Sequence, residues 1–283
     1  MKKLSIITIN WNDAAGLKAT IESVLRQTAR AEVEHIVVDG GSTDGSVEVL
    51  NEYKDRLEEG ISIPVKPIYK KMNIGTSLAK GEYCLFLNSG DTLHDEKTLE
   101  GILPELHDDD LVTGRIRFNS TGYFMTSPEE ISLLSLYEGN IPHPAAFIKR
   151  EWLVKYPYDE NLRIVSDWKF FLQMLIMGNA SLRRVDNIIT DYDTHGLSSK
   201  NRDLCEQEKH QVLHEMFPDR VLVDYFRFKK GGGYQETDYD RFYVKLRNYR
   251  AGKKIYSLNV RLLRFLSRFN PKANWVKSFP TKL

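Results

Sequence analysis

The chain has 283 residues, of which 41% are hydrophobic and 28% charged, and a net charge of +1, as is ordinary for a globular protein with an apolar core. Its two cysteines have no CxxC spacing, which excludes a disulfide scaffold and favours a reducing cytoplasm. No stretch approaches the ~20 apolar residues of a membrane-spanning helix, and the apolar run behind Met1 is too short for a signal peptide.

Two kinds of element alternate in the first hundred residues. Runs rich in β-branched residues predict buried strands, and apolar residues at helical spacing predict helices between them. The predicted strands are 4–9, 34–39, 63–69 and 83–87, and the predicted helices are 14–27, 46–58, 74–80 and 98–106. This alternation predicts an α/β fold with a mostly parallel central sheet flanked by helices.

The alternation weakens beyond residue 110. Strands are predicted over 111–118 and 188–192. A short helix is predicted to begin at Glu151, and a second helix is predicted more clearly over 168–177. No internal repeat or low-complexity tract interrupts these elements.

Polar side chains follow three of the predicted strands. Asn10, Asp39 and Asp91 each lie just past the carboxyl end of a strand. In an open α/β sheet, ligands bind beyond the carboxyl ends of the strands. We therefore expect all three side chains to open onto one crevice.

Several motifs of the first third occur in the order and spacing of one enzyme family. They are the opening strand with Thr8 and Asn10, then 23–28 (SVLRQT), 37–46 (VVDGGSTDGS), 79–83 (AKGEY) and 86–91 (FLNSGD). Weaker matches follow at 143–144 (HP), 166–168 (SDW) and 196–199 (GLSS). Together they resemble family 2 glycosyltransferases, with far more specificity than a lone short motif. The resemblance implies a GT-A nucleotide-diphospho-sugar transferase fold and an inverting sugar transfer.

The resemblance implies a set of donor-binding residues. Asp39 would accept hydrogen bonds from a nucleobase edge or a ribose hydroxyl, with Thr8 beside it. The other implied contacts to the donor are Asn10, Asn73, Asn88 and Ser89. An alternative role for Asp39 is that of a turn-forming residue before two glycines.

One segment departs from the family pattern. Where relatives often carry Ile-Tyr-Asp-Ala-Met-Asn, this chain has Ile-Tyr-Lys-Lys-Met-Asn over 68–73. Lys70 therefore replaces an acid that usually faces the donor. A lysine in this place can pair with the diphosphate of the donor.

A divalent metal is expected at Asp91. The nucleotide leaves as a diphosphate, whose charge Mn²⁺ or Mg²⁺ neutralises through oxygen ligands. His195 is a further candidate ligand, since some GT-A enzymes use a histidine. Two other Asp-x-Asp patterns, 108–110 and 191–193, are not expected to hold the donor metal, because the first lies in a polar turn and the second in a late strand.

Asp167 is the candidate general base. It precedes an apolar helix, whose amino-terminal dipole favours the ionised carboxylate, and the resemblance puts the family's base here. An inverting transfer needs one carboxylate that takes the proton of the attacking hydroxyl. The alternative is a plain N-cap, a role that Ser166-Asp167 would also fill. His143 is a weaker candidate contact to the diphosphate or the acceptor.

The carboxyl-terminal part is strongly basic. From Arg241 to Leu283 there are twelve Lys or Arg residues and no acid, which leaves 28 basic and 39 acidic residues before it, a net charge of −11. The stretch 255–269 combines an apolar stripe with an arginine face. This pattern favours either a helix on an anionic membrane surface or one packed on the catalytic domain. Nucleic-acid binding is not expected, since the acidic remainder carries no nucleic-acid module.

These observations predict a GT-A domain over 1–225, with a nucleotide-binding half over about 1–110 and an acceptor-binding half over about 111–225, and a basic, amphipathic helical extension over 226–283. We expect a cytoplasmic, metal-dependent inverting glycosyltransferase that moves a sugar, from a UDP-sugar by preference, to a glycan or lipid-linked acceptor in surface polysaccharide biosynthesis. Membrane contact through 241–283 would make it peripheral on the inner face of the plasma membrane. The alternative is a non-catalytic nucleotide-sugar-binding or scaffold subunit of the same fold, motivated by Lys70 and the single acid at Asp91.

Overall fold

The computed structural model describes residues 2–193 and 201–227. The chain divides into two compact units, Met1–Asp219 and Arg220–Leu283. In the second unit the described residues belong to the helix α10 (Asp219–Arg227), and 228–283, with the basic stretch 241–283, lies outside the described part. Within the described residues, no helix is long and apolar enough to cross a membrane.

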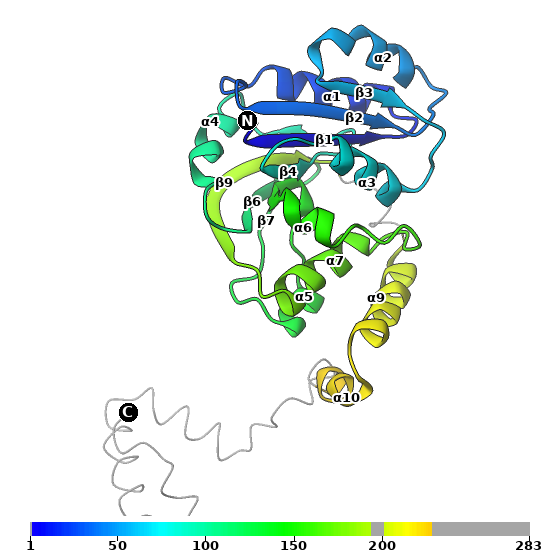
Figure 1. Ribbon diagram of the computed structural model, residues 1–283, viewed down its shortest axis with the longest axis vertical. Helices are drawn as coiled ribbons and strands as arrows, with labels where there is room; N and C mark the ends of the chain where they lie inside the picture. Colours follow the sequence, from blue (N-terminus) through cyan, green and yellow to red (C-terminus); the bar gives the residue numbers. More distant parts are fainter. Residues whose placement is uncertain (1, 194–200, 228–283) are drawn as a thin grey trace, which may run out of the picture. The chain divides into compact units, whose positions relative to one another are not determined.

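One mixed sheet runs through the first unit (Figure 1). Nine strands of the described residues form it, in the order β3-β2-β1-β4-β8-β6-β9-β5, with β7 paired to β6. They are β1 (Leu4–Asn10), β2 (Val33–Asp39), β3 (Glu59–Ser62), β4 (Tyr83–Phe86), β5 (Thr92–Leu93), β6 (Leu111–Phe118), β7 (Phe124–Met125), β8 (Ala146–Lys149) and β9 (Leu182–Tyr192). β1 to β4 are parallel, so their carboxyl ends meet at one edge, and the predicted α/β fold is confirmed.

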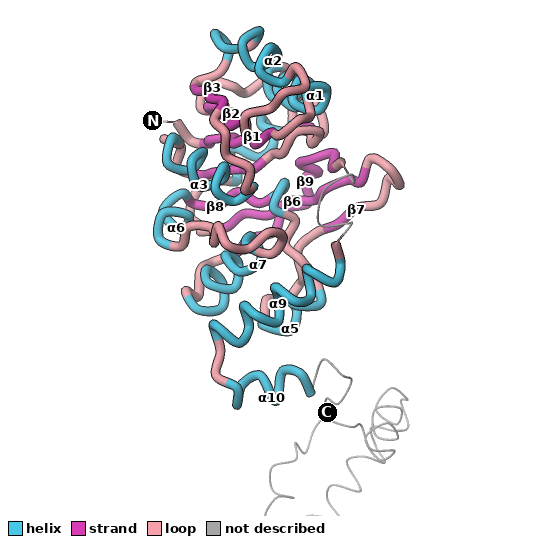
Figure 2. Tube along the Cα trace, turned by 90° about the vertical axis from the view of Figure 1, so that its right-hand side faces the viewer, coloured by secondary structure: helices cyan, strands magenta, loops and turns pink. Residues whose placement is uncertain are grey.

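Helices cover both faces of the parallel strands (Figure 2). They are α1 (Ala14–Leu25), α2 (Ser46–Glu52), α3 (Ile68–Leu78) and, further along, α4 (Thr98–Ile102). Leu17 of α1 packs with Val37 of β2 in a buried cluster. Gly75 of α3 lies so close to Ile7 of β1 that a Cβ atom would come within 2.3 Å of the Ile7 side chain. Val37 pairs with Thr8, the neighbour of Ile7, so α1 and α3 occupy opposite faces.

The second half of the first unit adds antiparallel and parallel strands to the same sheet. β8 is inserted antiparallel between β4 and β6, and β9 runs parallel to β6. The helices here are α5 (Leu133–Glu138), α6 (Arg150–Lys155), α7 (Ser166–Phe171), continued by a π-helical stretch (Leu172–Met177), and α9 (Arg202–Met216). Near its carboxyl end β9 pairs with β5, with Thr92 opposite Asp191. This pairing brings the end of β9 next to Asp91.

Between residues 46 and 80, three predicted elements differ from the structure. The helix predicted over 46–58 ends at Glu52 and is followed by a 3₁₀ turn (Lys54–Arg56). The strand predicted over 63–69 is wrong, because β3 already ends at Ser62. Pro64 and Pro67 have no N–H group to donate to a strand ladder, and Pro67 instead precedes α3, which begins at Ile68 rather than at 74.

Candidate active site

Three strand ends bring polar side chains together at one edge of the sheet. Asn10, at the end of β1, donates from Nδ2 to Asp39 Oδ1 at 2.7 Å. Ser89, beyond β4, donates to Asn10 Oδ1 at 2.7 Å. Asp91 follows Ser89 in the same loop, and its backbone carbonyl accepts from Thr20 of α1 at 2.7 Å. The three strand-end residues thus belong to one connected polar edge.

Asp39 is a fully buried carboxylate surrounded by donors. Oδ1 accepts from Asn10 and from the Ser42 hydroxyl, and Oδ2 accepts from the Ser62 hydroxyl and the backbone amides of Gly41 and Ser42, all within 3.0 Å. Burial alone would raise the pKa of Asp39, but the hydrogen bonds from Ser42, Ser62 and Asn10 outweigh it and lower the pKa. The carboxylate therefore holds the following loop in place through Gly41 and Ser42.

Asp91 has the opposite surroundings. Its side chain is buried, Oδ1 accepts from the backbone amide of Asp193 at 3.0 Å, and Oδ2 has no hydrogen-bond partner. Burial raises the pKa of Asp91 to about 8, and the neighbouring Asp193 adds to the rise. A buried carboxylate oxygen without a donor is a natural ligand for a cation.

Asp193 lies beside Asp91. A Cβ atom at Gly90, whose φ is +93°, would come within 3.0 Å of Asp193 Oδ2. The carboxylates of Asp91 and Asp193 therefore lie close together and could both be oxygen ligands of one divalent cation. The diphosphate of a bound donor would supply further oxygen ligands. Among the described residues no group of three or more His, Cys, Asp or Glu side chains is arranged to hold a metal, and His195 lies outside them.

The late Asp-x-Asp pattern separates into two roles. Asp191 is an internal anchor: it accepts from Nε and Nη2 of Arg117 (2.8 and 2.6 Å), and His94 Nδ1 lies 2.9 Å from its Oδ1. Asp193, two residues on, reaches the Asp91 loop instead. The sequence offered only the alternation of a strand as a signal, because the contact depends on the pairing of β9 with β5.

Asp167 lies in the first turn of α7, with its carboxylate mostly buried. Tyr69 of α3 has its hydroxyl 3.0 Å from Asp167 Oδ1 and 2.5 Å from the Ile164 carbonyl. His143 Nδ1 is 3.6 Å from Asp167 Oδ2. The Asn88 amide Nδ2 lies 3.3 Å from His143 Nε2 and can only donate, so the ring proton is on Nδ1, facing Asp167.

These contacts connect the Asp91 loop to Asp167. Asn88, three residues before Asp91, reaches His143, and His143 faces Asp167. Burial lowers the pKa of His143, although Asp167 acts against this, and the imidazole is therefore neutral at about pH 7.

The backbone before Asp167 is fixed by a carboxylate from α9. Glu208, 7% exposed, accepts from the amides of Arg163 (2.8 Å), Ile164 (2.9 Å) and Val165 (3.2 Å). Three consecutive amides before a helix would otherwise be unsatisfied. Glu208 thus sets the position of the α7 amino terminus, and sequence inspection missed it because α9 is distant along the chain.

The other predicted donor contacts have varied surroundings. Thr8 is buried, and its hydroxyl bonds His35 Nε2 at 2.9 Å, on the face covered by α1. Asn73 donates from Nδ2 to the backbone carbonyl of Tyr158, and its Oδ1 accepts from the backbone amide of Tyr158, each at 2.9 Å. The structure does not bring these two side chains to the polar edge that Asn10, Ser89 and Asp39 form.

The two lysines of α3 differ sharply. Lys70 is exposed, whereas Lys71 is 3% exposed and has a single long contact to the Lys66 carbonyl at 3.4 Å. Lys71 Nζ lies 3.0 Å from the position of a Cβ atom at Gly40, next to Asp39. Burial lowers the pKa of Lys71, while Asp39 acts against this. Lys71, which sequence inspection left aside, is therefore the lysine that faces the Asp39 loop.

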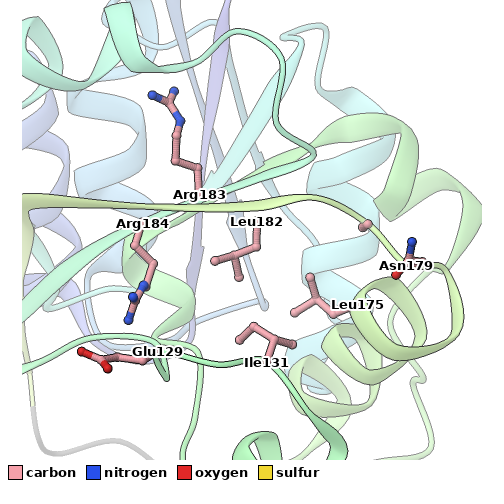
Figure 3. A pocket seen from close by; sticks show the side chains of 8 residues that line it. Glu129, Ile131, Leu175, Asn179, Leu182, Arg183 and Arg184 are labelled. Atoms are coloured by element: carbon pink, nitrogen blue, oxygen red, sulfur yellow. The ribbon is translucent and has the colours of Figure 1, made fainter. Parts of the chain in front are cut away.

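A separate hollow lies at the amino end of β9 (Figure 3). Its volume is about 540 Å³, and Leu175 and Leu182 contribute apolar walls. Arg184 and Glu129 point toward each other across it, whereas Arg183 points away and pairs with Glu105 at 2.7 Å. Asp193 follows the other end of β9, so this hollow is not part of the crevice edge.

The chain is similar to glycosyltransferases in sequence and in fold. The profile of the family "Glycosyl transferase family 2" matches residues 5–171. A PGL/p-HBAD biosynthesis glycosyltransferase of Mycobacterium bovis is 31% identical over 199 residues, covering 68% of this chain and 77% of the relative.

Two solved structures share the fold. Staphylococcus aureus TarS 1–349 has a TM-score of 0.59 at 21% identity, over 69% of this chain and 59% of that chain. Glucosyl-3-phosphoglycerate synthase of Mycobacterium tuberculosis has a TM-score of 0.54 at 18% identity, over 75% of this chain and 79% of that chain. The polar crevice edge therefore lies on a GT-A fold, and this chain belongs to glycosyl transferase family 2, the nucleotide-sugar glycosyltransferases.

Proposed function

We propose that this protein is a metal-dependent, inverting glycosyltransferase, with Asp91 and Asp193 as carboxylate ligands of Mn²⁺ or Mg²⁺ and Asp167 as general base. The observation that carries the metal assignment is the buried Oδ2 of Asp91, which accepts no hydrogen bond. A second carboxylate, that of Asp193, lies beside the same loop. When bound, the cation would neutralise the charge of the departing diphosphate. Asp193 also supplies the second acid whose absence motivated a scaffold role.

Asp167 has the surroundings of a base that is held in place. Tyr69 contacts Oδ1 and the neutral His143 faces Oδ2, so the carboxylate is oriented from two sides. In the proposed step, the acceptor oxygen bonds to the anomeric carbon as the bond from that carbon to the diphosphate oxygen breaks. The hydroxyl proton passes to Asp167, and the nucleoside diphosphate leaves with the electron pair.

The donor proposed is a UDP-sugar. Asp39 and Lys71 place an acceptor and a cationic donor beside one another, and a uracil edge offers an N–H group flanked by carbonyl oxygens. The TarS structure was solved with UDP-GlcNAc and the synthase structure with UDP and Mn²⁺. Binding to Asp39 would require the Ser62 hydroxyl to give up its place on Oδ2.

The acceptor proposed is a glycan or a lipid-linked saccharide in surface polysaccharide biosynthesis. The Mycobacterium bovis relative carries the name of a PGL/p-HBAD biosynthesis enzyme. The twelve basic residues over 241–283 support a peripheral position on an anionic membrane at the cytoplasmic face. Removal of 228–283 is expected to reduce sedimentation with anionic vesicles, and unchanged sedimentation would contradict this position.

Nucleotide release from UDP-, GDP- and dTDP-sugars, with Mn²⁺ or Mg²⁺, tests the proposal. We expect metal-dependent release from one donor, a fall of roughly 10²–10⁴-fold in Asp167→Asn, and complete loss in Asp91→Asn. Asp108→Asn is the matched control, because that side chain is 99% exposed. Release that needs no metal, or that survives Asp91→Asn, would contradict the proposal.

A further inference from the structure

Two histidines away from the crevice converge on the exposed side of α9. His210 and His214 are both exposed. Their Nε2 atoms are 3.3 Å apart and their ring centroids 4.4 Å. Residues four apart on a helix face the same side, so the His-x-x-x-His spacing itself produces the convergence.

The distance between the two nitrogens is that of two ligands of one metal ion. Imidazole nitrogens at about 2.0–2.1 Å from a tetrahedral Zn²⁺ are separated by about 3.3–3.4 Å. When no metal is bound, a hydrogen bond with its proton between the two Nε2 atoms accounts for the same distance. A cation in place of that proton would be held by both nitrogen lone pairs.

A carboxylate sets the tautomer of one ring. Asp219 Oδ1 lies 3.3 Å from His214 Nδ1. A carboxylate accepts, so the proton of His214 is on Nδ1, and the lone pair of Nε2 is directed toward His210. Carboxylate–histidine pairs of this kind orient metal-ligating imidazoles and raise their basicity.

We propose that His210 and His214 bind a divalent transition-metal cation such as Zn²⁺, Ni²⁺ or Cu²⁺, with Asp219 as the outer partner of His214. Imidazole nitrogens favour these ions over Mg²⁺ and Mn²⁺, which prefer oxygen ligands. The site is therefore chemically distinct from that at Asp91 and does not depend on the proposed reaction. Bound metal would cross-link the last turns of α9.

Calorimetric titration of the full, untagged chain with Zn²⁺, without nucleotide, tests this site. The wild type is expected to bind one Zn²⁺ more than His210→Ala or His214→Ala. Asp219→Asn is expected to bind it about tenfold more weakly. His107→Ala is the matched control, because His107 is an exposed histidine beside Asp108 and should leave the titration unchanged.

Equal stoichiometry and affinity in the wild type and both histidine variants would overturn the proposal. Loss of Zn²⁺ binding in Asp91→Asn, with the histidine variants unaffected, would assign the ion to the crevice and would overturn it equally. Circular dichroism of each variant shows whether α9 and the remainder of the fold are retained, and both substitutions are on exposed positions.

Discussion

Two carboxylates at the same edge of the sheet have opposite surroundings. Asp39, the last residue of β2, accepts five hydrogen bonds from three side chains and two backbone amides. Asp91, after β4, is just as buried but accepts one backbone amide, and its second oxygen has no donor. The pKa of Asp39 is lowered and that of Asp91 is raised to about 8.

The difference separates a carboxylate held by the protein's own donors from one with an open acceptor position. A buried carboxylate whose acceptor positions are filled stabilises its loop, because each donor would otherwise lose a partner. A buried carboxylate with an unfilled position costs folding free energy until a cation occupies it. At the β2 end the acceptor positions are thus filled by the protein alone, whereas at the β4 end one position is open and would be filled by the proposed metal.

The largest expected effect is on folding stability. Asp39→Asn places an amide NH₂ among donors and is expected to lower the free energy of unfolding by about 3 kcal/mol. Asp91→Asn removes a buried carboxyl group whose ionisation is opposed by burial, and is expected to leave stability unchanged or raise it by about 1 kcal/mol in EDTA. Urea unfolding of both variants measures the difference. Equal destabilisation would mean that the two carboxylates do not differ in this way.

A second filled carboxylate extends the comparison to Asp167. Glu208→Gln leaves one acceptor oxygen for three amides and is expected to cost about 2 kcal/mol of stability and to slow nucleotide release. Glu215→Gln, the same change on α9 in a 45% exposed side chain, is expected to cost under about 1 kcal/mol. Similar losses in the two variants, by thermal unfolding, would argue against a positioning role for Glu208.

The pH dependence of stability tests the burial of His35, a residue of β2. Burial lowers the pKa of His35 to about 3, from 6.5 in the unfolded chain. Between these values the unfolded chain binds more protons, so the free energy of unfolding falls as the pH falls. A change from pH 7 to pH 5.5 should cost about 1 kcal/mol at this residue. His35→Gln should remove this part of the pH dependence, and an unchanged slope in urea titrations would contradict it.

The smallest effect is expected at Ser62. An ionised carboxylate has about four acceptor positions, so Asp39 remains filled by its other donors when Ser62→Ala removes one. Stability should fall by less than about 1 kcal/mol. If Asp39 meets the nucleoside through Oδ2, UDP affinity should be retained or improved, as calorimetry would show. A large loss of UDP affinity would instead give the Ser62 hydroxyl a direct role.

Local patterns were sufficient to predict the parallel half of the fold. β-branched runs and helical spacing predicted β1, β2 and β4, and the strand-end rule predicted that Asn10 and Asp39 would meet. The pattern failed between residues 58 and 73, where two prolines were included in a strand although they interrupt it.

Long-range pairing decided the parts that were missed. Asp193 meets Asp91 because β9 returns antiparallel to β5, about a hundred residues later. Glu208 reaches 163–165 from a helix beyond the family match. Lys71, not Lys70, is buried, because α3 begins at Ile68 and turns that side chain toward the sheet. None of these contacts leaves a periodic signal in the sequence.

The most direct test of the central claim is UDP binding by calorimetry with and without Mn²⁺, in the wild type, Asp91→Asn and the control Asp108→Asn. The account predicts that Mn²⁺ strengthens UDP binding in the wild type and the control, and that Asp91→Asn loses this gain while it keeps its fold. An Asp91→Asn variant that binds UDP and Mn²⁺ as the wild type does would contradict the assignment of the metal to the β4 end.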